Sequence, residues 1–307
     1  MSAITPDLRL LRYFVAVAEE LHFGRAAEQL HIAQPSLSRA IRDLERLLGA
    51  DLFTRTKRSV RLTDAGRALL AEAPRALTEV ERAVEETRRV GRGEVGELRL
   101  GFLPSATVEL VPALVRASRA AFPSLRLQLL ELLDDPQLEA LRERRIDLGL
   151  LRTARPGGEL TVEPLLRERL SLAVAHDHHL AGRKRVRYAD LRDEPLILWP
   201  RSEAPETFDA VIEACRGAGF SPRVTQEATS AHTIIGLVAA GVGVSVLASS
   251  YRARSGEDVV FIPIAGTETT LHLAWLRHER SAARDNLIAI ARRVAAQLPG
   301  RLPAVRV

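Results

Sequence analysis

The stretch AAEQLHIAQPSLSRAIRDLERLLG, from Ala26 to Gly49, decides the fold of the N-terminal part of the chain. Two apolar runs at helical spacing meet in it, around residues 32–36. Pro35 suits the start of the second helix, because the N–H that proline lacks is not needed there. Apolar residues then recur in steps of four and three, and they predict one buried stripe made of Leu37, Ile41, Leu44 and Leu48.

The opposite face of this second helix is polar and basic. At 100° per residue it carries Pro35, Ser38, Arg39, Arg42 and Arg46. Two helices joined by a short turn, the second with such an outer face, are typical of a helix-turn-helix that places its second helix in the major groove of DNA. The alternative is an amphipathic helix whose charged face is only solvated, and periodicity alone does not decide between the two.

If the second helix enters DNA, its first turns carry the candidates for base contacts. Short polar side chains there reach base edges, and arginine pairs with guanine through two hydrogen bonds. The base-proximal candidates are Gln34, Pro35, Ser36, Ser38 and Arg39. Arg42 lies further along the same face, and we expect it nearer the phosphates.

The segment DLFTRTKRSVRLT, residues 51–63, predicts two short strands joined by a basic tip, which is a β-wing. Arg55, Lys57 and Arg58 are expected to hold phosphates or to enter the minor groove, where narrow A·T segments attract cations. From Ser36 to Leu62 the chain carries seven cations and three acids. This local clustering favours a polyanionic partner, and with it the helix-turn-helix interpretation.

Residues 63–90 predict one long helix. Thr63 is a plausible N-cap, with Asp64 in the first turn. Twenty-eight residues span about 42 Å in an α-helix. Because a helix of this length has no core of its own to pack against, we expect it to pair with the same helix of a second copy. The expected seam repeats in steps of four and three: Leu69, Ala73, Ala76, Val80, Ala83 and Thr87. Pro74 should kink the helix.

These pieces occur in an order that resembles the LysR-type transcriptional regulators. The matching motifs are Ala-Ala-x-x-Leu, Gln-Pro-Ser-Leu-Ser, Leu-Glu-x-x-Leu-Gly, Leu-Phe-x-Arg and Leu-Thr-x-Ala-Gly, followed by the long helix. The resemblance implies an effector-responsive regulator that binds promoter DNA as a homodimer or homotetramer and works with RNA polymerase. The domains expected are a winged helix-turn-helix (1–62), a linker and dimerisation helix (63–90), a Gly-rich hinge (91–97) and an effector domain.

The C-terminal two-thirds alternate strand and helix patterns. Residues 98–152 predict β-α-β-α-β, which implies parallel strands with helical crossovers, and a second such series follows. The fold class is therefore α/β and multidomain. Its effector domain is expected to have two subdomains, residues 98–168 with 270–307 and residues 169–269. By resemblance this half is similar to periplasmic binding proteins, with a small molecule in the cleft.

The cleft residues are predicted from strand ends, because ligands of open α/β sheets bind beyond the carboxyl ends of the strands. The candidates are Ser105, Asp134, Arg152, Pro200, Arg201, Ser202, Thr229, Ser230 and His232. The resemblance supports Ser105, Asp134, the 200–202 turn and His232. The competing interpretation is that Ser105, Thr229 and Ser230 only cap helices and that the two arginines are solvated.

Asp134 departs from the family pattern, because relatives that bind carboxylate effectors commonly carry a hydroxyl residue at the matching position. A carboxylate here would repel a dianion. It favours an effector with a hydroxyl or amine group, unless the side chain faces away from the cleft. A muconate-like dicarboxylate is therefore not expected.

Composition limits the other functions. No apolar run is long enough for a membrane span, the N-terminus lacks a signal-peptide pattern, and we expect a cytoplasmic protein. We interpret the one cysteine, Cys215, as a small residue that fills space in the core and not as a reactive thiol. The run HDHH (176–179) is either a metal-ligand cluster or a surface loop, and its position after a strand favours the loop.

No cofactor, metal or catalytic motif is predicted, because P-loop, HExxH and Gly-x-Ser-x-Gly patterns are all missing from the sequence. Two other functions compete with a regulator. A bilobal binding protein or enzyme would explain residues 97–307 but not the first 90, and an architectural nucleoid protein would explain the basic end but not the cleft.

Overall fold

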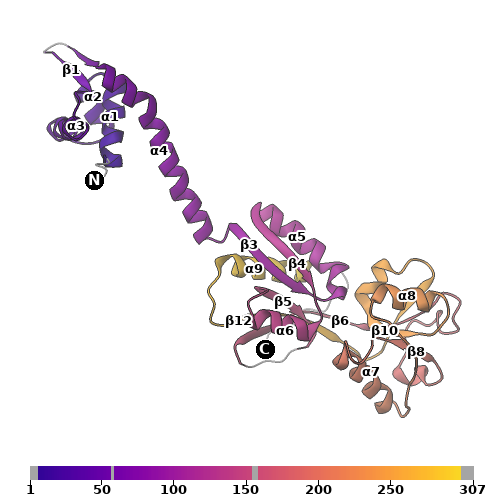
Figure 1. Ribbon diagram of the computed structural model, residues 1–307. Coiled ribbons are helices and arrows are strands. Elements are labelled where there is room, and N and C mark those ends of the chain that lie inside the picture. Colours follow the sequence, from indigo (N-terminus) through magenta and orange to yellow (C-terminus); the bar gives the residue numbers. More distant parts are fainter. Residues whose placement is uncertain (1–5, 57–58, 154–157, 299–307) are drawn as a thin grey trace. The chain divides into compact units, whose positions relative to one another are not determined.

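The computed structural model describes residues 6–56, 59–153 and 158–298 (Figure 1). The chain forms two compact units that divide between Arg89 and Val90, and each is described by itself. No helix within the described ranges combines the length and apolar character that a bilayer crossing needs.

The N-terminal unit is a three-helix core with a two-stranded wing. Its elements are α1 (Leu8–Glu20), α2 (Phe23–Gln29), α3 (Gln34–Leu48), β1 (Phe53–Arg55) and β2 (Val60–Leu62). The strands pair antiparallel, with Phe53 opposite Leu62. Leu37, Ile41 and Leu44 of the predicted stripe are fully buried against Phe14 and Val17 of α1. The predicted winged helix-turn-helix is therefore present.

Two local details concern the ends of the helices. Leu48, the last member of the predicted stripe, is 40% exposed, because α3 ends there and Gly49 turns the chain away with a φ of 66°. The break before α2 falls at Leu21, which adopts a φ of 48°, and Gly24 lies inside α2. The ring of His22 caps α2, since its Nδ1 accepts from the N–H groups of Gly24 and Arg25 at 3.1 Å.

Helix α4 (Asp64–Gly91) runs through Pro74 as one element of 28 residues. Thr63 caps it as predicted, because its Oγ1 accepts from the N–H of Gly66 at 2.9 Å. The first turns of α4 belong to the core of the N-terminal unit: Ala73 is buried there, and Leu69 packs against the same cluster. Leu69 and Ala73 are thus core residues and not members of an open seam.

In the C-terminal unit, a five-stranded sheet has the order β4-β3-β5-β12-β6. Its strands are β3 (Val95–Phe102), β4 (Ser124–Glu131), β5 (Leu148–Leu151), β6 (Leu160–Glu168) and β12 (Thr269–Leu276). β3 pairs in parallel with β4 and β5, and β12 runs antiparallel between β5 and β6. The sheet carries α5 (Leu110–Ala121), α6 (Asp134–Arg142), α9 (Ala282–Gln297) and the short helix η1 (Pro104–Thr107).

The expected hinge at 91–97 is largely ordered structure, because α4 extends to Gly91 and β3 already begins at Val95. The residues between them are tied to α9. Asn286 donates its side-chain N–H to the carbonyl of Arg92 at 2.8 Å. Gly93, with a φ of 70°, lies so close to α9 that a Cβ would meet the backbone N of Ala283 at 2.2 Å. Glycine is therefore required at this position by both backbone conformation and space.

A second subdomain is built on a sheet of order β10-β7-β11 and a parallel pair β8-β9. The strands are β7 (Leu170–Ala175), β8 (Pro195–Leu198), β9 (Arg223–Glu227), β10 (Ser245–Ala248) and β11 (Val259–Pro263). The helices are α7 (Pro205–Gly217), α8 (Ala231–Ala239), η2 (Tyr188–Leu191) and η3 (Ser249–Arg254). The chain crosses between subdomains twice, from β6 to β7 and from β11 to β12. This is the predicted α/β arrangement of two subdomains.

The side chain of Gln137 locks α6 onto the five-stranded sheet. Its fully buried amide donates to the carbonyls of Leu132 and Leu150 at 2.8 and 3.0 Å, and its Oε1 accepts from the N–H of Leu150 at 3.0 Å. Gly149 leaves room for it, since a Cβ there would lie 3.1 Å from that Oε1. This amide fixes the start of α6, and with it the position of Asp134.

We expect Gln137→Ala to destabilise the C-terminal unit by about 3 kcal/mol, because it leaves the buried backbone groups of Leu150 without partners. Thermal unfolding of the full chain measures the effect. The control is Gln128→Ala on exposed β4 of the same sheet, which should leave the melting temperature nearly unchanged. Equal losses in the two variants would contradict the role given to Gln137.

Candidate functional sites

The outer face of α3 presents the predicted base-proximal residues. Gln34, Pro35, Ser36 and Arg39 are exposed, and Ser38 is half-buried. The buried stripe on the opposite side holds the helix rigidly against the core, so these side chains are offered to a partner on a fixed support. The arrangement matches what a major-groove helix requires.

Most arginines of the N-terminal unit are held in ion pairs. The paired ones are Arg9, Arg12, Arg25, Arg46, Arg55, Arg67, Arg75, Arg82, Arg88 and Arg89. Among the described residues of this unit, those that make no ion pair are Arg39, Arg42 and Arg61. Arg42 donates only to the carbonyl of Ser38 in its own helix, at 3.3 Å. Uncompensated positive charge is therefore concentrated on α3 and β2.

Arg55, for which a phosphate contact is predicted, has a role within the fold. Its guanidinium pairs with Glu45 at 2.7 Å and lies over the ring of Phe23 at 4.8 Å. The same Glu45 carboxylate accepts from the N–H groups of Leu52 and Phe53 at 3.0 and 3.3 Å. Arg55 thus holds the wing onto α3. The other two predicted wing contacts, Lys57 and Arg58, lie outside the described residues.

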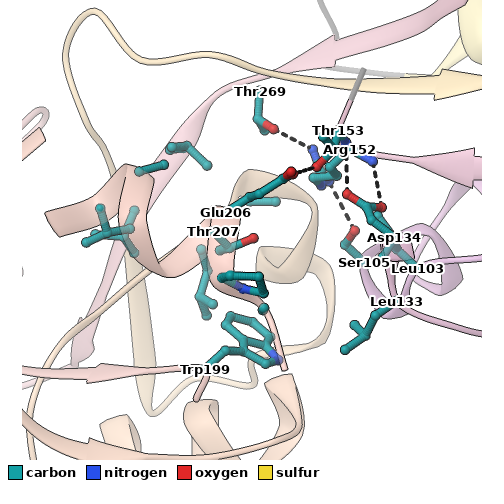
Figure 2. Close-up of a pocket in the computed structure, with 18 of the residues that line it drawn as sticks. Leu103, Ser105, Leu133, Asp134, Arg152, Thr153, Trp199, Glu206, Thr207 and Thr269 are labelled. Atoms are coloured by element: carbon teal, nitrogen blue, oxygen red, sulfur yellow. Dashed lines mark hydrogen bonds between the residues drawn. The ribbon is translucent and has the colours of Figure 1, made fainter. Parts of the chain in front are cut away.

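A cavity of about 550 Å³ lies in the cleft between the two subdomains of the C-terminal unit (Figure 2). Ser105, Asp134 and Arg152 line it from the first subdomain, as predicted. The second subdomain contributes residues that strand-end reasoning missed, including Trp199 directly after β8 and Glu206 at the start of α7. Most of the lining is apolar, as is usual for small-molecule sites.

Arg152 is the centre of a hydrogen-bonded network at the floor of the cleft. Its guanidinium donates to Ser105 Oγ and to Thr269 Oγ1, both at 3.1 Å, and forms an ion pair with Glu168 (Figure 2 shows the two hydroxyl contacts). Glu168 is buried, and its other oxygen accepts from the N–H of Ser250 at 3.1 Å. Arg152 is therefore not solvated, and its charge is already compensated within the protein.

Asp134 lines the cavity, but its carboxylate is engaged with the chain. Its two oxygens accept from the N–H groups of Arg152 and Thr153 at 3.1 and 2.9 Å (Figure 2). It thereby braces the turn after β5. The hydroxyl of Thr153 in turn donates to Glu206 across the cleft, which links the two subdomains directly.

Six predicted cleft residues are absent from the cavity lining that the described residues form: Pro200, Arg201, Ser202, Thr229, Ser230 and His232. Arg201 makes two hydrogen bonds to Asp209 of α7, at 2.8 and 2.9 Å, which lower the pKa of that carboxyl. Ser230 caps α8, because its Oγ accepts from the N–H of Thr233 at 3.1 Å. The segment from Glu203 to Thr207, which follows the 200–202 turn, lines this wall of the cavity instead.

Two tyrosines add hydroxyl groups to the cavity wall. Tyr188 and Tyr251 both line it. Burial raises the pKa of Tyr188 to about 12, and burial raises the pKa of Tyr251 as well, so both hydroxyls keep their protons at neutral pH. Tyr251 lies on η3, which directly follows β10. The end of this strand can be predicted from the sequence, but the cleft candidates did not include a residue from it.

The HDHH run is tied to a buried acid. Nε2 of His178 and Nε2 of His179 lie 3.2 and 3.3 Å from the two oxygens of Glu194. Nδ1 of His178 accepts from the N–H of Leu180 at 3.3 Å, which places the proton of the ring on Nε2 facing Glu194. This contact joins the loop to the start of β8.

Comparisons with known proteins match both units of the chain. Residues 8–67 match the family "Bacterial regulatory helix-turn-helix protein, lysR family", and residues 91–296 match "LysR substrate binding domain". The chain belongs to the LysR family of transcriptional regulators. It is a DNA-binding regulator with an effector-binding domain, and the family match excludes the alternative of a bilobal enzyme.

Individual relatives cover nearly the whole chain. The HTH-type transcriptional regulator AlsR of Bacillus subtilis is 40% identical over 83% of this chain and 84% of its own. The uncharacterised regulator YnfL of Escherichia coli is 40% identical over 91% and 96%. The crystal structure of CbnR, a LysR family regulator, has a TM-score of 0.83 at 30% identity over 93% of this chain and 100% of that one. CbnR has also been solved with its target DNA, with a TM-score of 0.79, 30% identity and coverage of 94% and 99%.

We expect Arg152→Met to cost about 3–5 kcal/mol of stability, because it removes the guanidinium that pairs with the buried carboxylate of Glu168. The double variant Arg152→Met/Glu168→Gln should recover a large part of this loss. Chemical denaturation of the wild type, the two single variants and the double variant gives the coupling free energy between the two side chains. The exposed pair Arg201 and Asp209 serves as the control. Arg201→Met and Asp209→Asn, alone or together, should leave the free energy of unfolding unchanged within the error of the measurement. Additive losses at Arg152 and Glu168 would contradict a coupled pair.

Proposed function

We propose that the N-terminal turns of α3 read the operator sequence, with Gln34, Pro35, Ser36, Ser38 and Arg39 nearest the bases and Arg42 nearer the phosphates. The observation that carries this proposal is the uncompensated charge of Arg39 on an exposed, rigidly supported helix face. A guanidinium that the protein has not already paired is available for the two-bond contact to guanine. Lys57, Arg58 and Arg61 of the wing would add contacts to the backbone.

Arg39→Ala should weaken operator binding by about 1–3 kcal/mol, the usual value of a good base contact, and weaken binding to random DNA much less. Fluorescence anisotropy at fixed salt with operator and scrambled duplexes measures both. The matched control is Arg46→Ala on the same helix, because Arg46 is already paired with Asp43 at 3.0 Å. Equal losses on the two duplexes would show that Arg39 contacts phosphate and not a base.

We further propose that α4 pairs with the same helix of a second copy and holds two DNA-binding units in register on two half-sites. The seam retains the predicted members beyond the N-terminal core: Ala76, Val80, Ala83 and Thr87. Ala83 and Thr87 are exposed in the single chain, and so is the neighbouring Val84, at 44%. Two such dimers would make a tetramer.

Val80→Glu should break this dimer and lower operator affinity, because a buried seam does not accommodate an unpaired charge. Sedimentation velocity reports the mass, and anisotropy reports the affinity. Ala71→Glu is the matched control, since it adds the same charge on the opposite, exposed side of α4. A dimer that persists in Val80→Glu at the same concentration would place the interface elsewhere.

For the C-terminal unit we propose that a small effector binds in the cleft and shifts the equilibrium between two arrangements of the regulator on DNA. The supporting observation is a cavity lined from both subdomains, with polar groups gathered at its floor. RNA polymerase is the expected partner of the bound regulator. DNA as the target makes the cytoplasm the expected location.

A further inference from the structure

We propose that the C-terminal unit carries a second binding site, separate from the effector cleft, and that this site takes a phosphate group. It is a cavity of about 370 Å³ lined by Arg169, Arg185 and residues 263–268. The site does not depend on the effector proposed for the cleft. Its support comes from two arginines without partners, the backbone that places them and the position of the cavity between the subdomains.

The two arginines of this cavity are uncompensated. Both side chains are exposed, and within the described ranges neither Arg169 nor Arg185 makes an ion pair or a side-chain hydrogen bond. Among the described lining residues the one acid is Glu268, which is already paired with Arg167 at 3.1 Å. Two cations at one cavity, with no protein anion between them, raise the local concentration of anions.

Backbone hydrogen bonds place the two arginines beside one segment, residues 263–265. The residue that follows each arginine is bonded to it. Leu170 accepts from an N–H of the segment at 3.0 Å, and Val186 makes two hydrogen bonds to the segment, at 3.1 and 2.8 Å. Both side chains therefore start from fixed points of the backbone, and an anion bound between them has to order only the side chains.

The donors of the cavity favour a phosphate over a single carboxylate. Each guanidinium presents a fork of N–H groups that fits two oxygens of a carboxylate or a phosphate. A carboxylate has two oxygens and one negative charge, whereas a phosphate offers at least three oxygens and a charge of about −1.5 to −2 near neutral pH. A phosphate can therefore bind both arginines at once. Gly266 adds an N–H to the lining for which the described residues provide no acceptor.

The cavity lies where the chain crosses between the two subdomains. Arg169 is the residue that joins β6 to β7, and residues 264–268 join β11 to β12. Thr267 and Glu268 line both this cavity and the effector cleft. A phosphate bound here would therefore contact both connections between the subdomains, next to a wall that the effector cleft shares.

Calorimetry of the full-length protein with inorganic phosphate, at constant ionic strength and pH, tests the site. Arg169→Gln/Arg185→Gln should weaken phosphate binding about tenfold, because each exposed charge contact is worth roughly a few-fold in affinity. The matched control is Arg216→Gln/Arg223→Gln, which removes two exposed charges from the same subdomain outside the cavity lining. A wild type that does not bind phosphate, or equal affinities in the two double variants, overturns the inference.

Three probes define the chemical class of the ligand: inorganic phosphate, glycerol phosphate and acetate. Acetate should bind several-fold more weakly than phosphate, and acetate that binds as tightly contradicts the preference for a phosphate group. Glycerol phosphate that binds as well as inorganic phosphate would show that the site accepts a phosphorylated metabolite. Inorganic phosphate that binds while the ester does not would identify the free anion as the ligand.

Two further measurements separate this site from the cleft and from DNA. Ala210 lines the effector cavity from the exposed side of α7, and Ala210→Trp should leave phosphate affinity unchanged. Loss of phosphate binding in this variant would place the anion in the cleft. In a phosphate-free buffer, Arg169→Gln/Arg185→Gln should bind operator DNA as the wild type does. A drop in operator affinity would show that these arginines contact the DNA backbone, and it would overturn a site for a small phosphate.

Discussion

The C-terminal unit depends on one buried carboxylate. Glu168 ends β6, immediately before the chain crosses from one subdomain to the other. A buried charge is tolerated only when it is paired and hydrogen-bonded, so Glu168 requires both the guanidinium of Arg152 and the N–H of Ser250. Arg152 then reaches Ser105 and Thr269. In this way one charge ties together the ends of β5 and β6, the start of β12 and the first turn of η3.

The charged side chains of both units fall into two groups. Some are paired within the fold, and the others are available to a partner. In the N-terminal unit Glu45 holds Arg55 and the backbone of β1, whereas Arg39, Arg42 and Arg61 make no ion pair among the described residues. In the C-terminal unit the guanidinium of Arg152 is used by the fold, because it pairs with the buried Glu168. The N-terminal unit therefore presents unpaired cations that suit polyanionic DNA, whereas the cation that lines the cleft is held within the protein.

Sequence patterns predicted the features that depend on local periodicity. The buried stripe of α3, the cap at Thr63 and the alternation of strands and helices follow from spacing along the chain, and all are present. The features that spacing does not reveal depend on tertiary pairing. Arg55 looks like any exposed wing cation until Glu45 is beside it, and Ala73 follows the seam repeat although it packs into the core. The strand-end rule found the right edge of the sheet, but it does not say which residue of a loop reaches the cavity, so it gave residues 200–202 where Trp199 and Glu206 line the wall.

The contact between Thr153 and Glu206 lies where the two subdomains meet at the cavity. The hydroxyl of Thr153, after β5, donates to the carboxylate of Glu206 at the start of α7, and this joins one subdomain to the other. A molecule bound in the cavity touches the same two walls, because residues of both subdomains line it. A ligand can shift an equilibrium only by its difference in affinity for the two states. The effector proposed for this cleft therefore has to bind one arrangement of the two walls better than another, and the contact between Thr153 and Glu206 is part of what it has to fit.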